Sequence, residues 1–353
     1  MLDYYRFAGP LVRLLDAETA HGLTIRALKL GLVPPQPRLE HPSLEVALWG
    51  LRFPNPVGLA AGFDKNAEVP GAMLRQGFGF VEIGSVTPRP QPGNPKPRMF
   101  RLVEDRAVIN RMGFNNQGLE AVVRRMETRA SIGIVGANLG KNKDTEDAAA
   151  DYEKGAARLA PLSDYLVINV SSPNTPGLRA LQGRDQLEAL VGRTRTALNA
   201  AVAEGKRPPL LLKIAPDLGD EDLADIAAVA LAGALDGLIV SNTTIARPEA
   251  LRSSHAKETG GLSGAPLFEP STEVLRRMFR LTEGRLPLVG AGGIASGAQA
   301  YAKIRAGASL VQLYSAMVYE GPGLITRIKR ELIDLLARDG FASVTDAVGA
   351  DLR

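Results

Sequence analysis

The sequence has no cysteine and only three histidines, and both features restrict the chemistry open to this chain. Without cysteine there is no disulfide, no thiolate nucleophile or base, and no iron–sulfur cluster ligated by the chain itself. The histidines, His21, His41 and His255, lie too far apart to match the ligand spacings of metal sites. We therefore expect no metal. The lack of cysteine also fits a cytosolic protein.

Long hydrophobic runs are also lacking. No mostly apolar stretch reaches the ~18 residues that span a bilayer, and the most apolar segment, 226–235, is typical of a buried helix. Asp3 and Arg13 interrupt the N-terminus and no small-residue cleavage site follows, so we expect no signal peptide. Charge of one sign is not in excess: 42 basic and 38 acidic residues give a net charge of +4, which argues against a nucleic-acid partner.

Residues 1–40 differ in pattern from the rest of the chain. Two apolar clusters, at 11–15 and 23–33, contain interspersed charges, and the proline-rich stretch 34–37 follows them. The pattern predicts two short amphipathic helices closed by a stiff linker. Such helices either pack on the main domain or form a pad that contacts a membrane or admits an apolar ligand, and the periodicity alone favours packing.

From residue 44 onward, an apolar strand, a polar or glycine-rich turn and a helix recur along the chain, and 45% of all residues are hydrophobic. Strands are predicted at 57–61, 80–84, 132–138, 165–170, 210–214, 237–241, 286–290 and 309–313. Helices are predicted at 118–129, 147–159, 186–204, 220–234, 272–281, 299–305 and 324–337. Eight strands alternating with helices favour an α/β fold of the (β/α)8 TIM-barrel type over residues 41–353, with residues 1–40 as a small helical extension.

In such barrels the carboxyl ends of the strands carry the site. The fourth predicted strand leads into Asn169, Ser172 and Asn174 in a turn stiffened by prolines, which either presents polar groups to a planar ligand or caps the next helix. Lys213 stands in the otherwise apolar fifth strand, and lysine is rarely buried unpaired. We expect Lys213 to point into the barrel mouth toward an anionic group, in preference to an internal salt bridge.

Glycines follow the seventh predicted strand at 290–293, and Ser315 follows the eighth, where barrels of this type bind a phosphate. Two long connections precede these features. The first, 88–116, is either a functional loop or a hairpin on the barrel mouth, or both. The second, 245–270, is predicted to be a mobile lid.

These strand ends together suit a flat, phosphorylated cofactor, and flavin mononucleotide (FMN) fits. Lys213 near N1 and O2 of the ring would stabilise the anionic reduced flavin. The amides of Asn110, Asn169, Asn174 and Asn242 would then hold a second flat ring over the flavin.

Several motifs resemble those of the dihydroorotate dehydrogenase family, specifically its quinone-dependent, membrane-associated class. They cover nearly the whole chain in order: GLAAGFDK at 58–65, NRMGFNN at 110–116, NVSSPNT at 169–175, SNTT at 241–244, GLSG at 261–264 and GAGGI at 290–294. The soluble class of the family is similar but uses a cysteine base and lacks N-terminal helices. This chain has Ser172 at that place, so the resemblance favours membrane contact for residues 1–40.

The resemblance also implies residue roles. FMN binding is implied for Ala61, Gly62, Phe63, Asp64, Lys65, Ser85, Asn138, Asn169, Lys213, Ser241, Gly264, Gly293, Tyr314 and Ser315. Dihydroorotate binding is implied for Lys65, Asn110, Arg111, Met112, Gly113, Phe114, Asn169, Asn174, Asn242 and Thr243. His21, Arg101 and Tyr314 are implied to line a quinone tunnel. Ser85 and Ser241 stand where threonine is common in the family and keep its hydroxyl.

The implied reaction is the oxidation of (S)-dihydroorotate to orotate in pyrimidine (UMP) biosynthesis. Ser172 would take the C5 proton while a hydride passes from C6 to flavin N5, and the reduced flavin would pass its electrons to a membrane quinone. Thr87, Thr175 or a water would relay the serine proton. We expect a monomer, peripheral on the cytoplasmic face of the cell membrane, with neither an iron–sulfur partner subunit nor a nucleic-acid partner.

Three alternatives remain from the residues alone. One is another FMN barrel that oxidises a different substrate or uses a different acceptor. Another is a non-catalytic barrel that binds a phosphorylated ligand, which would need neither Ser172 nor Lys213. The third is a membrane-surface scaffold.

Overall fold

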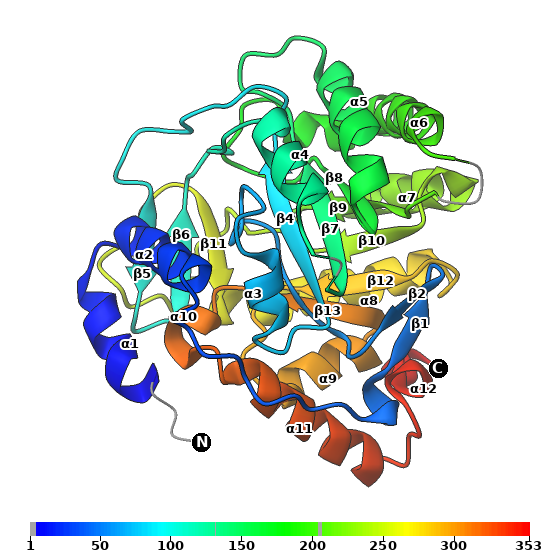
Figure 1. Ribbon diagram of the computed structural model, residues 1–353. Coiled ribbons are helices and arrows are strands. Elements are labelled where there is room, and N and C mark those ends of the chain that lie inside the picture. Colours follow the sequence, from blue (N-terminus) through cyan, green and yellow to red (C-terminus); the bar gives the residue numbers. More distant parts are fainter. Residues whose placement is uncertain (1–4, 131, 204–206) are drawn as a thin grey trace.

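The computed structural model describes residues 5–130, 132–203 and 207–353. Its centre is a closed barrel of eight parallel strands in the order β10-β12-β13-β3-β4-β7-β8-β9, with helices around it (Figure 1). The barrel strands are β3 Val57–Leu59, β4 Phe80–Val86, β7 Ile134–Leu139, β8 Tyr165–Asn169, β9 Leu210–Ile214, β10 Gly237–Val240, β12 Leu288–Ala291 and β13 Ala308–Leu313. Each overlaps a predicted strand, so the predicted barrel is confirmed.

The larger helices also overlap the predictions. They are α4 Leu119–Glu127, α5 Ala148–Leu159, α6 Arg184–Ala201, α7 Asp220–Val229, α8 Phe268–Leu281, α9 Gly297–Arg305 and α11 Leu324–Arg338. The predicted end of α6 at Glu204 lies outside the described residues. The predicted helix 220–234 is wrong in its last turn, because the π-helical segment Ala230–Ala234 contains Gly233 with φ 91°. Strand β12 begins two residues later than predicted, after Pro287, which has no N–H for the sheet.

Several short elements were not predicted. They are the hairpin β1 Val46–Leu48 with β2 Leu51–Phe53, the helices α3 Pro70–Leu74, α10 Met317–Glu320 and α12 Val344–Ala347, and the 3-10 turns Pro42–Leu44, Ala160–Leu162, Arg179–Gln182, Ala265–Leu267 and Ala350–Leu352. Hairpin β1–β2 closes the amino-terminal end of the barrel, where Trp49 Nε1 donates to the Asp236 carbonyl at 2.7 Å. Behind it the rings of Phe53 and Phe80 pack edge to face, 5.3 Å apart.

Strands β8, β9 and β10 are buried along their whole length, as expected for strands covered on both faces. Two glycines make room for the aromatic side chains inside the barrel. A Cβ on Gly58 would lie 2.2 Å from the Phe80 ring, and a Cβ on Gly136 would lie 2.1 Å from the Tyr165 ring. The amino-terminal half of the barrel is therefore filled with protein, which leaves the carboxyl end for the site.

A small antiparallel sheet covers the carboxyl end of the barrel. It consists of β5 Met99–Leu102, β6 Ala107–Asn110 and β11 Gly261–Gly264 in the order β11-β6-β5. The first long connection therefore does form a hairpin. The second is not a free lid along its whole length, because its β11 portion pairs with β6 from Gly261 opposite Asn110 to Gly264 opposite Ala107.

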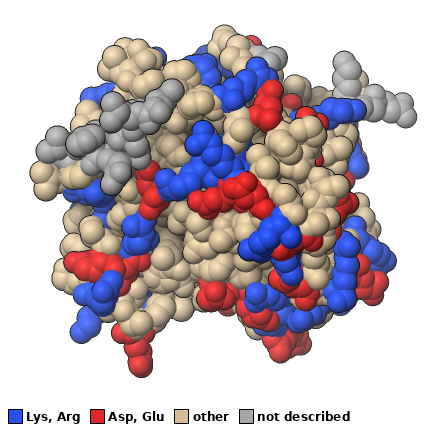
Figure 2. All heavy atoms as spheres, turned by 90° about the horizontal axis from the view of Figure 1, so that it is seen from below, with Lys and Arg blue, Asp and Glu red and all other residues tan. Residues whose placement is uncertain are grey.

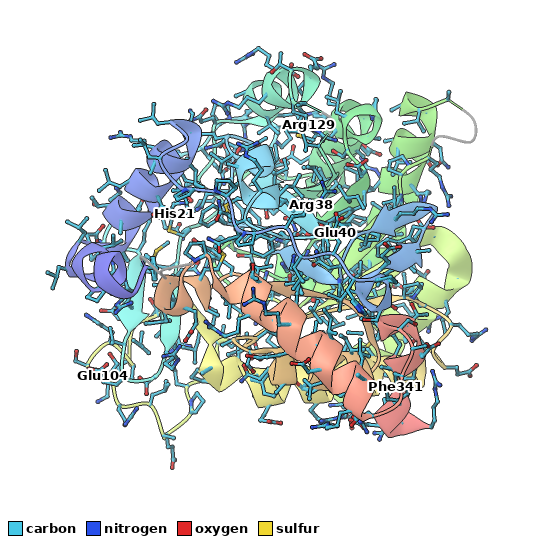
Figure 3. The ribbon with its side chains drawn as sticks, turned by 60° about the horizontal axis from the view of Figure 1, so that its bottom comes forward. His21, Arg38, Glu40, Glu104, Arg129 and Phe341 are labelled. Carbon is cyan, nitrogen blue, oxygen red and sulfur yellow. The ribbon has the colours of Figure 1, made fainter. Side chains whose placement is uncertain are left out.

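The N-terminal segment forms the two predicted helices, α1 Tyr5–Leu14 and α2 Ala17–Lys29, beside β5, β6 and α10 (Figure 1). Residues 1–4 of the predicted extension lie outside the described part. The following linker, which carries Arg38 and Glu40 (Figure 3), reaches α11, where Lys329 Nζ donates to the Leu39 carbonyl at 3.0 Å. Among the described residues, no helix is both long and apolar enough to cross a bilayer.

Charged side chains of both signs are interspersed on the face shown in Figure 2, which agrees with the small net charge. Leucines are exposed at the N-terminal helices instead: Leu14 is 83%, Leu30 73% and Leu32 70% exposed. The three most exposed large hydrophobic side chains of the described residues therefore lie on the extension.

Candidate active site

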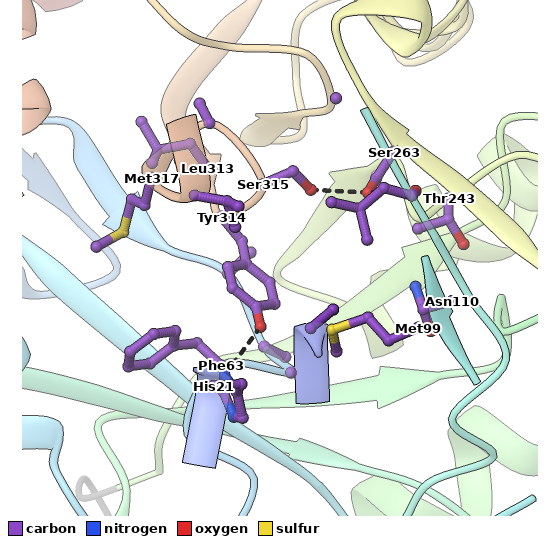
Figure 4. A pocket seen from close by; sticks show the side chains of 18 of the residues that line it. His21, Phe63, Met99, Asn110, Thr243, Ser263, Leu313, Tyr314, Ser315 and Met317 are labelled. Carbon is purple, nitrogen blue, oxygen red and sulfur yellow. Dashed lines mark hydrogen bonds between the residues drawn. The ribbon is translucent and has the colours of Figure 1, made fainter. Parts of the chain in front are cut away.

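A cavity of about 590 Å³ lies between the carboxyl end of the barrel, the sheet β11-β6-β5 and helices α1 and α2 (Figure 4). This volume is within the range of small-molecule and cofactor sites. Most residues singled out in the sequence line it: His21, Ala61, Gly62, Phe63, Lys65, Ser85, Arg101, Asn110, Met112, Phe114, Asn169, Ser172, Asn174, Lys213, Ser241, Asn242, Thr243, Gly264, Gly293, Tyr314 and Ser315. The predicted residues that do not line it are Asp64, Arg111, Gly113 and Asn138.

The side chain of Asp64 shapes a loop and does not face the cavity. Its carboxylate accepts hydrogen bonds from the backbone N–H groups of Glu68 at 2.7 Å and Val69 at 2.8 Å. Burial raises the pKa of the Asp64 carboxyl, and these backbone hydrogen bonds oppose that rise. Arg111 likewise points elsewhere: it pairs with Glu258 at 2.6 Å and lies over the Phe100 ring.

The polar wall of the cavity is a connected set of side chains at the ends of β4, β7 and β8. Asn169 Nδ2 donates to Ser85 Oγ at 2.9 Å and to Asn138 Oδ1 at 3.1 Å. The Ser85 hydroxyl in turn donates to Asn138 Oδ1. Asn138 therefore orients the cavity-lining groups from behind, and the amides hold one another in a fixed arrangement.

This network ends on Glu82, a fully buried carboxylate inside the barrel. Glu82 accepts hydrogen bonds from Asn138 Nδ2 at 2.8 Å and from Gln312 Nε2 at 2.6 Å. Lys213 Nζ lies 3.9 Å from Glu82 Oε1. Sequence analysis missed Glu82 and Gln312, although a glutamate in the apolar strand β4 and a glutamine in β13 were visible signals.

The preference against an internal salt bridge for Lys213 was therefore wrong, because Glu82 is its buried partner. Lys213 nevertheless lines the cavity as expected. Burial lowers the pKa of its ammonium group, and the Glu82 charge raises it. The separation of 3.9 Å exceeds a hydrogen-bond distance, so the Nζ protons stay available to a ligand.

Ser172 lies in the loop after β8 and is 7% exposed. Its Oγ accepts a hydrogen bond from the Asn174 N–H at 3.3 Å, and Asn174 Nδ2 donates to the Asn110 carbonyl at 3.1 Å. This loop thereby joins the hairpin β5–β6. The Thr87 hydroxyl donates to the Arg89 carbonyl at 2.7 Å, whereas Thr175 Oγ1 is buried without a partner among the described residues.

Lys65 supplies a cation to the cavity. Its Nζ donates to the Gly62 carbonyl at 2.7 Å. Burial lowers the pKa of Lys65 to about 8, and the Glu18 carboxylate on α2 opposes that shift. Lys65 is therefore mostly protonated at neutral pH and suited to an anionic ligand.

The end of the cavity beside β12 and β13 is formed by glycines and hydroxyls. Ser263 Oγ and Ser315 Oγ lie 2.7 Å apart and share a hydrogen bond (Figure 4). Gly293 has φ 75°, and a Cβ there would lie 2.5 Å from backbone atoms of Phe268. Backbone and small side chains thus surround this end, as in barrels that bind a phosphate there.

The opposite side of the cavity is apolar and lies under α1 and α2. His21, Phe63 and Tyr314 meet there (Figure 4): the His21 and Phe63 ring centroids are 5.3 Å apart, and Tyr314 OH lies 3.3 Å from His21 Nδ1. Burial, and next the charge of Lys65, lowers the pKa of His21 to about 3, so its ring is neutral at physiological pH. Arg101 donates to the Arg13 and Leu15 carbonyls at 2.5 Å each, which ties β5 to the turn between the helices.

Comparison with known proteins is consistent with this geometry. The family model for dihydroorotate dehydrogenase matches residues 43–336, most of the chain. The chain belongs to the dihydroorotate dehydrogenase family.

Relatives in this family cover the chain from end to end. A Rhodospirillum rubrum protein named dihydroorotate dehydrogenase (quinone) is 65% identical over 353 residues, which are 100% of this chain and 96% of the relative. A mitochondrial dihydroorotate dehydrogenase (quinone) of rice, Oryza sativa subsp. japonica, is 55% identical over 375 residues, covering 99% of this chain and 80% of the relative.

A crystal structure of DHODH from Eimeria tenella in complex with ferulenol has a TM-score of 0.93 and 47% identity, covering 97% of this chain and 99% of that one. Membership of this family makes the chain an enzyme, as the motifs indicated. Its barrel is also the fold of the related crystal structure. In this member of the dihydroorotate dehydrogenase family, the cavity lies at the carboxyl ends of the barrel strands, where barrel enzymes carry their sites.

Proposed function

We propose that this chain oxidises dihydroorotate to orotate in pyrimidine biosynthesis, with FMN as its prosthetic group and a quinone as electron acceptor. The observation that carries the proposal is a single cavity with two unlike sides. One side is a wall of hydrogen-bonded amides and hydroxyls with Ser172, and the other is the apolar group His21, Phe63 and Tyr314.

The residues present fit FMN. Lys213 has free donor capacity toward the edge of a flavin ring, and the hydrogen-bonded side chains of Ser85 and Asn169 line the cavity as its polar wall. Gly293 and Ser315 would hold the phosphate at the strand ends. When bound, FMN supplies the two-electron acceptor that the amino acids lack.

The substrate would lie against the loop that follows β8. The Lys65 ammonium would pair with the carboxylate of dihydroorotate, while Asn110, Asn174 and Asn242 would meet its alternating carbonyl and N–H groups. Ser172 would accept the C5 proton. A serine hydroxyl is a weak base unless its own proton can leave, so Thr87, Thr175 or a water would relay that proton.

The quinone would enter on the apolar side. His21 is neutral and Tyr314 OH is within hydrogen-bond reach of it, which suits an uncharged carbonyl ligand. The exposed Leu14, Leu30 and Leu32 would contact the bilayer surface, from which the quinone comes. The chain would thus be a peripheral protein on the cytoplasmic face of the cell membrane, working as a monomer.

Anaerobic mixing of the purified protein tests this proposal. Dihydroorotate should bleach the visible flavin absorbance, and a ubiquinone or menaquinone analogue should restore it, whereas NAD or fumarate should not. A flavin that dihydroorotate does not bleach would point to a barrel for another substrate. A colourless protein that binds no added FMN would overturn the flavin assignment and leave a phosphate-ligand-binding barrel.

A further inference from the structure

Arg179, in the short turn Arg179–Gln182 beyond Ser172, connects the loops that follow three adjacent barrel strands. Its Nε donates to the Ser171 carbonyl at 3.0 Å, after β8. One terminal nitrogen donates to the Thr243 carbonyl at 3.0 Å, after β10. The other pairs with Asp217 Oδ2 at 2.8 Å, after β9.

Asp217 extends the connection into the segment that leads to β11. Its Oδ1 accepts a hydrogen bond from the Thr244 hydroxyl, and its Oδ2 accepts one from the Ile245 N–H at 3.2 Å. Thr244 and Leu262 then exchange backbone hydrogen bonds at 3.1 and 2.8 Å. The Arg179–Asp217 pair therefore anchors the beginning of the second long connection, 245–270.

The two side chains are largely shielded, with 22% of Arg179 and 17% of Asp217 exposed. Hydrogen bonds between charged groups are stronger than neutral ones, and a planar guanidinium fixes the directions of its partners. Neither side chain lines the cavity. Both must therefore act on the site through the backbone of the residues they hold.

The two carbonyl groups that Arg179 holds belong to residues next to Ser172 and Asn242, the side chains that would meet the substrate. Ser171 precedes Ser172, and its hydroxyl accepts a hydrogen bond from Asn242 Nδ2 at 2.9 Å. Thr243 follows Asn242 and lines the cavity. A shift of the loop after β8 relative to the loop after β10 would move Ser172 away from the substrate ring that Asn242 would hold.

We propose that Arg179, with Asp217 as its partner, is a positioning residue that fixes Ser172 against Asn242 and Thr243 for proton removal from the substrate. This inference rests on the proposed function. It concerns only the step in which dihydroorotate reduces the flavin, because the contacts of Arg179 lie at the ends of β8, β9 and β10 and those of His21 and Tyr314 lie elsewhere in the cavity.

The test compares Arg179→Gln, Arg179→Lys and Asp217→Asn with the native holoenzyme, using anaerobic rapid mixing. A displacement of about 1 Å at a reacting group costs on the order of 100-fold in rate. Arg179→Gln should therefore slow flavin reduction at saturating dihydroorotate by about that factor. Arg179→Lys keeps a positive charge for Asp217 but cannot reproduce all three contacts of the guanidinium group. It should therefore be slower than the native enzyme but faster than Arg179→Gln. The rate of flavin reoxidation by quinone should not change.

The matched control is Arg184→Gln. Arg184 lies five positions further along, begins α6 and, within the part of the chain that the structure describes, forms ion pairs at the surface with Glu188 and Asp225 at 3.3 and 3.6 Å. This variant should keep both rates. Bound FMN and the unfolding temperature are measured for every variant, so that a general loss of structure is seen as such.

Reduction at the native rate in Arg179→Gln and Asp217→Asn would overturn the inference. So would an equal loss of both half-reactions together with FMN, because that pattern indicates a structural role. If Arg179→Gln does not fold, Arg179→Lys and Asp217→Asn still test the inference, because the rate of flavin reduction can be compared with the rate of reoxidation in each of them. If dihydroorotate fails to reduce the native protein, the proposed function fails and the variants have no bearing on that result.

Discussion

The two sides of the cavity are built in different ways. The polar side rests on the closed barrel, and its members Ser85, Asn138 and Asn169 are bonded to one another and to buried Glu82. The apolar side joins His21 of α2 to Phe63 and Tyr314, which follow the barrel strands β3 and β13, and these rings pack edge to face or lie at hydrogen-bond distance from one another. The polar side is thus preorganised for one ligand geometry, whereas the apolar side is shaped for a ligand that enters from an apolar phase.

Side-chain contacts attach α1 and α2 to neighbouring parts of the chain, among them the hydrogen bond from Tyr5 OH to the Val318 carbonyl at 2.9 Å. Glu18 on α2 pairs with Arg98 at 2.7 Å, Lys29 pairs with Glu68 at 2.8 Å, and Arg101 holds the turn between the helices. Because different contacts hold the polar side and the apolar side, substitutions should be able to alter one side without the other. Changes on one side should affect one half-reaction and spare the other.

Removing the Ser172 hydroxyl should give the largest effect. Without its base, Ser172→Ala should reduce its flavin about 10²- to 10⁴-fold more slowly with dihydroorotate, the usual size of a general-base contribution. FMN binding and reoxidation by quinone should stay normal. Single-turnover absorbance measurements check both rates, with the exposed Ser254→Ala as control. Near-native reduction would contradict the assignment of the base.

Making the exposed leucines polar should affect the other side alone. The double variant Leu30→Ser, Leu32→Ser removes two side chains that are 73% and 70% exposed, and its binding to anionic lipid vesicles should fall on the order of tenfold to 100-fold. Flavin reduction by dihydroorotate should be unchanged. Sedimentation with vesicles measures the first quantity. Unaltered vesicle binding would show that the membrane surface lies elsewhere.

The pH dependence should also differ between the two sides. The pKa of Lys65 is lowered to about 8, so Lys65 is charged below that pH and loses its charge as the pH rises through it. The kcat/KM for dihydroorotate should then fall about tenfold per pH unit above 8. His21, with a pKa of about 3, stays neutral from pH 6 to 9, so kcat/KM for quinone should be flat there. If kcat/KM for dihydroorotate still falls near pH 8 in Lys65→Met, a group other than Lys65 is responsible for the titration.

The smallest expected effect is that of Tyr314→Phe, which removes only the hydroxyl near His21. Losing one neutral hydrogen bond costs about 1 kcal/mol, so the KM for quinone should rise roughly fivefold. Flavin reduction should not change. Steady-state titration with a short-chain quinone measures this. A fall in the reduction rate of similar size would show that the Tyr314 hydroxyl serves the polar side as well.

The barrel was predictable because its strands are buried on both faces and so appear as separate apolar runs. Site residues followed from the rule that strand ends carry function, which placed Asn169, Ser172 and Lys213 in one cavity. The pairing of Lys213 with Glu82 did not follow, because opposing side chains inside a closed barrel come from strands far apart in the sequence.

The sheet over the barrel shows the same limit. Strand β11 pairs with β6, about 150 positions earlier in the chain, and its short Gly-Leu-Ser-Gly sequence has no strand periodicity. The contribution of Arg179 was hidden for a similar reason, since its partners are the Ser171 and Thr243 carbonyl groups and the Asp217 carboxylate, which lie in three separate loops. The local sequence predicts individual helices and strands. The pairing of β11 with β6 and the contacts of Arg179 form only when distant parts of the chain meet in the folded barrel.

The most direct test of the two-sided cavity is the effect of orotate on each half-reaction. Enzyme is reduced chemically, freed of reductant, and mixed anaerobically with a short-chain quinone, with and without saturating orotate. If the two ligands use opposite sides, orotate should compete with dihydroorotate during flavin reduction yet leave the rate of reoxidation by quinone unchanged. Competition between orotate and quinone for the reduced enzyme would show that both ligands use the same side, and would contradict a cavity with two separate sides.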